Sequence, residues 1–176
     1  ILNYDLHNKD KINYNQRVKE IIAEGYKGAK AIRKDATVMT STIVTSDKGF
    51  FDKLSLKEQR LFFEESYKFL KECYGEKNIV SAVVHMDETT PHMHLHFVPV
   101  NQENGKLQAR ALMTPARINK IHTEAPKYLQ QKGFDVERGK GKTEKNLDIH
   151  RFKAEKLRED INILEDRLNA LEGDLG

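Results

Sequence analysis

Four histidines and two carboxylates fall within twelve consecutive residues, HMDETTPHMHLH, at positions 85–96. Alternate side chains of a strand share one face, so His92 and His94 would point the same way, roughly 7 Å apart. An apolar run of strand length precedes the segment, and Pro91 excludes a helix within it. A tight reversal would then return His85 to the pair. The pattern predicts a metal centre on two neighbouring strands.

The residue types indicate which ions this centre could hold. Neutral imidazole nitrogens and carboxylate oxygens suit Mn²⁺, Zn²⁺, Ni²⁺ and Co²⁺. We expect His85, His92 and His94 to bind one divalent ion. Glu88 would lie beside that ion as a fourth ligand or as a general base. His96 continues the same face of the strand, and we expect it not to be a ligand. The zincin pattern H-E-x-x-H is absent from the sequence.

The metal segment resembles the corresponding motif of the plasmid mobilisation relaxases of the Mob/Pre (MobV) family, which belong to the HUH endonucleases. HUH enzymes are named for a His-hydrophobe-His pair on a central strand, which is His92-Met93-His94 in this sequence. Shorter blocks in family order extend the resemblance over most of residues 1–150: NYDL at 3–6, AIRKDA at 31–36, IVTSD at 43–47, YGEKNI at 74–79 and GFDVERG at 133–139.

The resemblance implies a site-specific and strand-specific DNA transesterase that acts in conjugative mobilisation and plasmid recombination. Such an enzyme nicks the single-stranded or hairpin DNA of a plasmid transfer origin and stays covalently attached to the 5′ phosphate. One divalent ion polarises the scissile phosphate while a protein nucleophile displaces the 3′ oxygen. We expect Mn²⁺ to be this ion, with Mg²⁺, Zn²⁺, Ni²⁺ and Co²⁺ as alternatives.

The resemblance also implies that the nucleophile lies outside this sequence. Family members carry a further N-terminal segment with the histidine thought to act as nucleophile, whereas this chain begins at Ile1, just before the NYDL block. We therefore expect an N-terminally truncated relaxase domain. Other HUH enzymes use tyrosine, so Tyr4 and Tyr14 are alternative nucleophiles. A tyrosine near nucleic acid more commonly stacks on a base.

Several residues are candidates for DNA contacts. Tyr4 and Tyr74 match positions that look like DNA-contacting ones in the family, and base stacking is the physical expectation for them. Tyr74 has the alternative role of a core aromatic at a helix end. Arg33 and Lys34 could hold the scissile phosphate, because Arg offers a phosphate two donors. A solvated helix end is an equally good interpretation of these two cations.

Net charge is a weak argument for DNA binding here, because it is only +3. The charge is segregated, however: residues 106–145 hold ten basic against four acidic groups, and residues 155–174 hold three against seven. Within the basic block, Arg138 and Lys140 lie in the glycine-spaced run RGKGK, which could follow a phosphate backbone. A solvated linker is the alternative interpretation of that run.

The cysteine content and the hydropathy of the sequence indicate where in the cell the protein resides. Cys73 is the single cysteine, so the chain has no disulfide framework, and a small buried hydrophobe is its expected role. No stretch of the sequence approaches the roughly 20 apolar residues of a membrane span. We expect a cytoplasmic protein without a membrane segment.

The hydrophobic pattern predicts helices at residues 13–32, 55–73 and 115–131. It predicts strands at residues 36–44 and 106–112, besides the two that carry the histidines. Short turns between strands, together with long helices, argue for an α+β fold in which helices cover one face of an antiparallel sheet. The palm-like fold of the HUH family has this architecture. The histidine face would be open to solvent and DNA.

The relaxase domain is expected at residues 1–147, followed at residues 148–176 by a C-terminal amphipathic helix. Apolar residues recur there at spacings of 3, 4, 3, 4 and 3, which indicates a short heptad seam. Such a helix could pack on the domain, continue beyond the sequence, or pair two protomers in a homodimer. The seam consists of Ala154, Leu157, Ile161, Leu164, Leu168 and Leu171.

Three other functions fit parts of this pattern. A rolling-circle replication initiator shares the histidine site and the nicking chemistry. A metal-dependent hydrolase of small molecules would require a closed pocket rather than an open basic groove. A non-catalytic DNA-binding and dimerisation module would describe a fragment whose nucleophile lies elsewhere.

Overall fold

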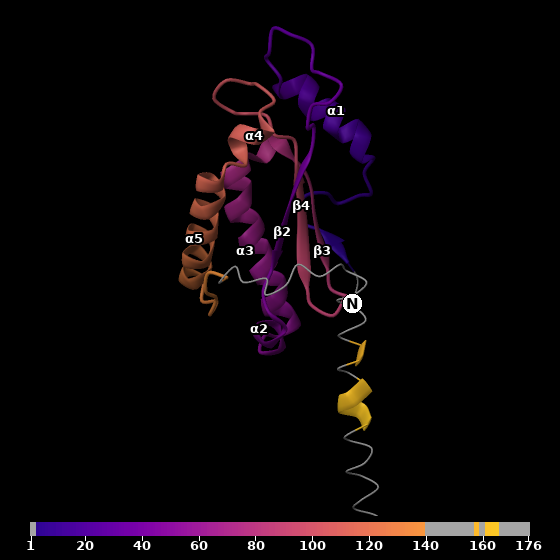
Figure 1. The fold of residues 1–176 in the computed structure, drawn as a ribbon, viewed down its shortest axis with the longest axis vertical. Coiled ribbons are helices and arrows are strands. Elements are labelled where there is room, and N and C mark those ends of the chain that lie inside the picture. The colour runs from indigo at the N-terminus through magenta and orange to yellow at the C-terminus, as the bar shows by residue number, and fades with distance from the viewer. Residues whose placement is uncertain (1–2, 140–156, 159–160, 166–176) are drawn as a thin grey trace, which may run out of the picture. The chain divides into compact units, whose positions relative to one another are not determined.

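The computed structural model describes residues 3–139, 157–158 and 161–165, and the chain divides into the units Ile1–Gly139 and Lys140–Gly176. A four-stranded antiparallel sheet forms the centre of the first unit, in the strand order β1-β3-β4-β2 (Figure 1). The predicted α+β class and antiparallel sheet are confirmed. The strands are β1 (Tyr4–Asp5), β2 (Thr40–Thr45), β3 (Ile79–His85) and β4 (His92–Phe97).

One face of the sheet carries the main hydrophobic core. Helices α2 (Lys48–Asp52), α3 (Leu56–Tyr74) and α5 (Pro115–Gln131) contribute to the cluster on this face. Because side chains alternate along a strand, Met93, Leu95 and Phe97 of β4 all point into the core, where they are fully buried. The histidines between them must therefore point to the opposite face.

A second, smaller core lies at one end of the sheet. Helix α1 (Tyr14–Gly25) buries Val18 and Ile21 against Val80, Val98 and Val100. Figure 1 shows α1 on the other side of the strands from α3. Helices therefore contact both sides of the sheet, and the expectation that they cover one face only was wrong.

The long helices begin and end at recognisable capping residues. Ser55 caps α3 in a capping box with Glu58, three residues further on. Thr114 caps α5, and Pro115 occupies the first turn, where its missing N–H costs nothing. Gly133, just after α5, adopts a φ of +91°, a conformation that glycine tolerates. These ends confirm the predicted helices at residues 55–73 and 115–131.

The structure corrects the boundaries of three predicted elements. Helix α1 ends at Gly25 rather than near residue 32, and β2 begins at Thr40 rather than residue 36. Residues 106–112 are not a strand: Leu107 alone bridges to Val100, and helix α4 (Ala109–Leu112) follows. Alanine, leucine and arginine favour that helix. Sequence reasoning also missed α2 and the short 3-10 helix η1 (Glu76–Asn78).

The second unit is described at residues 157–158 and 161–165, which are helical. The described seam residues Leu157, Ile161 and Leu164 are exposed. The remaining seam positions lie outside the described residues. Among the residues that the structure describes, no helix is long and apolar enough to cross a membrane.

Candidate metal centre

Strand register brings three histidines together on the face opposite the main core. His85 at the end of β3 lies directly across from His92 at the start of β4, and His94 follows two residues along β4. The ring centroids of the three lie 5.1 to 5.5 Å apart. One potential ligand atom from each ring lies within 4.8 Å of the others. The predicted reversal therefore assembles the predicted triad.

The donor set fits a divalent cation. The Nδ1 atom of His92 lies 3.0 Å from the Thr90 carbonyl oxygen. Because a carbonyl only accepts, Nδ1 must donate, and this leaves the Nε2 lone pair for a metal. Burial, reinforced by His92 and His85, lowers the pKa of His94 and favours its neutral, ligating form. All three rings are half-buried, so an ion at this position would remain open to a substrate.

Glu88 lies beside the triad, as the sequence predicted. Its Oε1 atom is 3.9 Å from Nδ1 of His85, and 60 % of its side chain is exposed. Asp87 also offers a carboxylate within 4.8 Å of these two residues. The loop between the two strands thus carries negative charge next to the imidazoles, where it can attract a cation or accept a proton.

His96 continues the histidine row but is engaged elsewhere. Its Nδ1 atom lies 3.1 Å from the Ser81 hydroxyl, and its ring stacks 6.1 Å from that of His94. The ring of Tyr14, at the start of α1, lies nearly perpendicular to that of His96, with the two ring centroids 5.8 Å apart. These contacts agree with the expectation that His96 is not a ligand. They also place Tyr14 on the histidine face, separated from the triad by the His96 ring.

Two residues that sequence reasoning missed hold β1 beside the metal strand. The Asn3 side chain accepts a hydrogen bond from the backbone N–H of Met86, the residue after His85, at 2.9 Å. The Asp5 carboxylate accepts one from the backbone N–H of Ala82, also at 2.9 Å. Both residues belong to the NYDL block, which offered the only sequence signal for this clasp.

Tyr4 and Tyr74 do not lie on the histidine face. Tyr74 is 4 % exposed, stacks on Phe97 with ring centroids 4.0 Å apart, and contacts the Thr42 hydroxyl at 3.3 Å. A base has no access to this ring, so the stacking expectation for Tyr74 is corrected to a core role. Tyr4 faces the main core as well, where the guanidinium of Arg60 lies 4.6 Å from the centre of its ring.

The positions of Tyr4 and Tyr14 bear on whether either tyrosine could act as the nucleophile. Tyr4 points away from the triad, and burial raises the pKa of its hydroxyl, which opposes a nucleophilic phenolate. The Tyr14 ring contacts His96 rather than a triad histidine, and it stands 38 % exposed. Neither tyrosine is placed against the predicted ligands.

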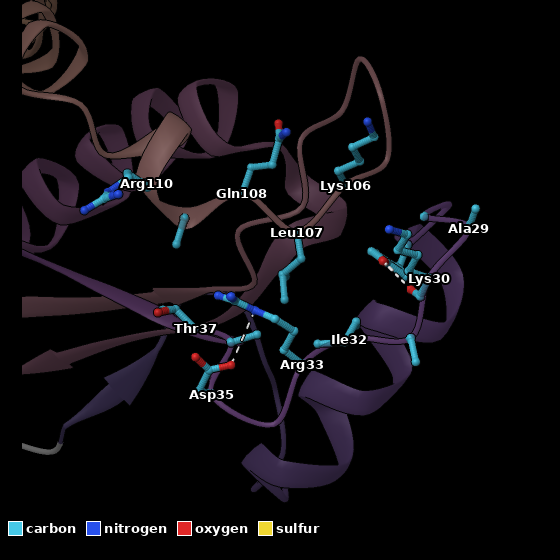
Figure 2. Close-up of a pocket in the computed structure, with 15 residues that line it drawn as sticks. Ala29, Lys30, Ile32, Arg33, Asp35, Thr37, Lys106, Leu107, Gln108 and Arg110 are labelled. Atoms are coloured by element: carbon cyan, nitrogen blue, oxygen red, sulfur yellow. Dashed lines mark hydrogen bonds and ion pairs between the residues drawn. The ribbon is translucent and has the colours of Figure 1, made fainter.

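Arg33 and Lys34 are exposed in the segment between α1 and β2. Arg33 lines a cavity of about 810 Å³ and pairs with Asp35 at 3.4 Å (Figure 2). Lys30, Lys106 and Arg110 also line this cavity. Figure 1 places the segment at the end of the sheet opposite the β3–β4 turn. Strand β4 alone spans roughly 17 Å between these two ends. Arg33 is therefore too far from the triad to hold a phosphate at the metal, which corrects the prediction that it holds the scissile phosphate.

Arg138 and Cys73 have other partners than the triad. Arg138 donates to Thr123 at 2.8 Å and to Asn119 at 3.1 Å, which fixes it on α5. Lys140 lies outside the described residues. Cys73 is half-buried against the main core, and burial raises the pKa of its thiol, in agreement with an unreactive packing residue.

The fold and the site define a class of protein: an antiparallel α+β domain whose two central strands present a histidine triad suited to a divalent metal. Comparison with known families narrows this class. The profile of the plasmid recombination enzymes (Mob_Pre) matches residues 1–154. The chain belongs to this family, and the predicted resemblance is confirmed.

Relatives and solved structures agree with this assignment. A plasmid recombination enzyme of a Bacillus species is 42 % identical over 174 residues, covering 98 % of this chain and 41 % of the relative. A type 2 enzyme of Staphylococcus aureus strain Mu50 is 42 % identical over 167 residues, covering 94 % of this chain and 39 % of the relative. The chain thus spans about two fifths of the length of these relatives.

Among solved structures, the MobM relaxase domain bound to Mn and the oriT DNA of plasmid pMV158 is 40 % identical. It superposes with a TM-score of 0.77, covering 86 % of this chain and 78 % of that one. A second Mn-bound complex of MobM with oriT DNA is 39 % identical, with a TM-score of 0.79 and coverage of 89 % and 81 %.

Proposed function

We propose that this chain is a relaxase domain that nicks one DNA strand at a plasmid transfer origin during mobilisation and recombination. The convergence of His85, His92 and His94 on an uncovered part of the sheet is the observation that carries the proposal. Family membership and the DNA-bound MobM structures support it. The three rings are only half-buried, which is unlike a hydrolase that encloses a small substrate at the metal.

The three histidines would hold one divalent ion, and Mn²⁺ is the proposed ion because the MobM complexes contain it. Bound there, such an ion would act as a Lewis acid on a phosphate oxygen of the scissile diester. The chain itself orients the ligands: the Thr90 carbonyl fixes the His92 tautomer, and β3–β4 pairing fixes the distance between His85 and His92. Burial and the neighbouring histidines lower the pKa of His94, which favours its neutral, ligating form.

The proposed nicking step is a transesterification. A nucleophile from the family's N-terminal segment forms a bond to phosphorus, the bond from phosphorus to the 3′ oxygen breaks, and that oxygen leaves as a 3′ hydroxyl after taking a proton. The products are a free 3′ end and a protein adduct on the 5′ phosphate. Glu88, exposed and 3.9 Å from His85, is placed to orient the nucleophile or accept its proton.

DNA beyond the scissile phosphate would contact basic side chains away from the metal. Arg33 lines a basic cavity with Lys106 and Arg110, and Lys34 is exposed beside it, so these residues are proposed to bind a more distant part of the strand. Arg138 and Lys140 remain proposed phosphate contacts of the segment after α5.

The proposed function also involves self-association and a location in the cell. We propose that the C-terminal heptad seam pairs two copies of the chain, supported by the exposure of Leu157, Ile161 and Leu164. Analytical ultracentrifugation of a Leu157→Glu, Leu164→Glu variant would then show a monomer where the unmodified chain forms a dimer. A cytoplasmic location follows from the proposed action on plasmid DNA.

A nicking assay tests the central proposal. The chain, extended by the family's N-terminal segment, is incubated with Mn²⁺ and a supercoiled plasmid that carries the transfer origin of its own replicon. We expect a relaxed product with protein attached to the 5′ end. His92→Ala should abolish nicking, whereas His96→Ala, the matched control on the same strand, should retain it. Normal nicking by His92→Ala would refute the assignment of the triad.

A further inference from the structure

The edge strand β2 presents an apolar residue next to the metal ligands. Ile43 pairs directly with His94 in the β2–β4 register and therefore points to the same face. It is 60 % exposed, more than any other large hydrophobic residue among the described positions 3–139. Neighbouring strands lie about 5 Å apart, so the Ile43 side chain borders the triad directly.

The surroundings of Ile43 suit a nucleic acid strand. Its exposed neighbours on the same face of β2 are Ser41 and Thr45, which lie beside His96 and His92. The strand reads TSTIVT and contains no charged residue. A polyanion can therefore follow β2 without meeting a carboxylate on the strand. The exposed Ser41 hydroxyl can donate to its sugar and phosphate oxygens, whereas the Thr45 hydroxyl already donates to the Pro91 carbonyl oxygen at 2.9 Å. Ile43 offers an apolar surface to the part of a nucleotide that is itself apolar, the face of the base.

Two further observations argue against an incidental surface residue. Single exposed apolar side chains are common, but edge strands usually carry charge or proline on their exposed positions to prevent unwanted pairing, and β2 carries neither. Tyr14 is also exposed on this face, where its ring edge contacts His96. The histidine row is thus bordered by two apolar groups on different elements.

We propose that Ile43 packs against a nucleobase of the single strand whose phosphate lies at the histidine triad, so that β2 positions that nucleotide. This inference rests on the proposed relaxase function. It assigns base contact to an aliphatic residue on the edge strand, whereas the sequence had suggested Tyr4 and Tyr74, both of which face the core.

Binding measurements on the chain as it stands test the proposal without requiring cleavage. Fluorescence anisotropy compares two probes at fixed salt and saturating Mn²⁺: a thymidine dodecamer and a dodecamer of abasic sugar phosphates. The variant is Ile43→Ala. The matched control is Leu56→Ala, which shortens a side chain of similar exposure, 57 %, at the start of α3.

Ile43→Ala should weaken binding of the thymidine probe about fivefold to tenfold, because truncation removes three carbon atoms from a partly covered contact. Binding of the abasic probe should not change, and Leu56→Ala should leave both affinities unaltered. Thermal unfolding of Ile43→Ala should match that of the unmodified chain, because the side chain is exposed.

Other outcomes would overturn the inference. If Ile43→Ala weakened binding of both probes equally, Ile43 would act on the sugar-phosphate backbone rather than on a base. If affinity for the thymidine probe were unchanged, Ile43 would make no base contact. A shift in sedimentation caused by Ile43→Ala, with DNA affinity unchanged, would assign this face to a second copy of the chain. Failure of the unmodified chain to bind either probe would instead overturn the proposed relaxase function together with the inference.

Discussion

Removal of a single triad histidine should abolish metal-dependent stabilisation, whereas removal of His96 should not. The relevant variants of the metal-stripped chain are His92→Ala, His94→Ala and His96→Ala. All four histidines lie on one face of the sheet, so the variants differ little in local environment. They differ in whether the ring contributes a ligand atom to the group within 4.8 Å or is bonded to Ser81 at 3.1 Å.

The size of the stabilisation depends on whether the triad can reach metal-binding distances and on the Mn²⁺ concentration. Imidazole nitrogens around a tetrahedral ion lie about 2.1 Å from it and therefore about 3.4 Å from one another. The triad atoms lie within 4.8 Å of one another, so they would have to approach by at most about 1.4 Å to reach that separation. Mn²⁺ at about 100 times its dissociation constant would then raise the free energy of unfolding by about 2.7 kcal/mol. For a domain of this size the melting temperature would rise by about 8 °C.

Isothermal titration with Mn²⁺, followed by thermal unfolding with and without the ion, measures both quantities. The unmodified chain and His96→Ala should bind one ion and gain the same stability. His92→Ala and His94→Ala should gain none at the same concentration. Loss of binding in His96→Ala alone, or retention of full affinity in both triad variants, would refute this account of the metal centre.

Three further predictions follow from contacts in the core and at a helix end. Tyr74→Ala should lower the free energy of unfolding in urea by about 3–5 kcal/mol, and Tyr74→Phe by about 1 kcal/mol with unchanged DNA affinity. Weaker DNA binding by folded Tyr74→Phe would instead show that the Tyr74 hydroxyl contacts DNA. Burial lowers the pKa of His7 below its usual value of 6.5. As the pH drops below about 6.5, His7 therefore binds a proton more readily in the unfolded chain than in the folded one, and the free energy of unfolding should fall. In EDTA, His7→Gln should show a shallower fall between pH 7.5 and 5.5, and an unchanged slope would contradict this origin. Ser55→Ala removes the capping hydroxyl of α3 and should cost about 1 kcal/mol in the same urea assay, while an unaltered midpoint would show that the cap contributes nothing.

The metal centre could be predicted because its determinants are local. Spacing along one strand placed His92 and His94 on the same face, and a proline-containing reversal returned His85 to them. The capping box at Ser55 is likewise a pattern of four residues. Such features depend on backbone periodicity and on few distant contacts, so the sequence alone carries them.

Features that depend on tertiary packing were beyond sequence reasoning. Whether Tyr74 faces DNA or the core depends on Phe97, which is 23 residues away in the sequence. The position of Arg33 depends on the path of an irregular segment with no periodic pattern. The side chain of Asn3 contacts a backbone group 83 residues further along the chain, and no local rule indicates such a partner.

The hydrogen bond that the N–H of Met86 donates to the Asn3 side chain fixes where any preceding residues would enter the domain. Asn3 is attached to the residue that follows His85, so a segment leading into it would arrive at the metal end of the sheet. Four extended residues span about 13 Å, and Asn3 is bonded to the residue next to His85. A nucleophile carried only a few positions ahead of Asn3 would therefore reach the triad without a long linker. An affinity tag fused at the same position would compete with DNA for that space.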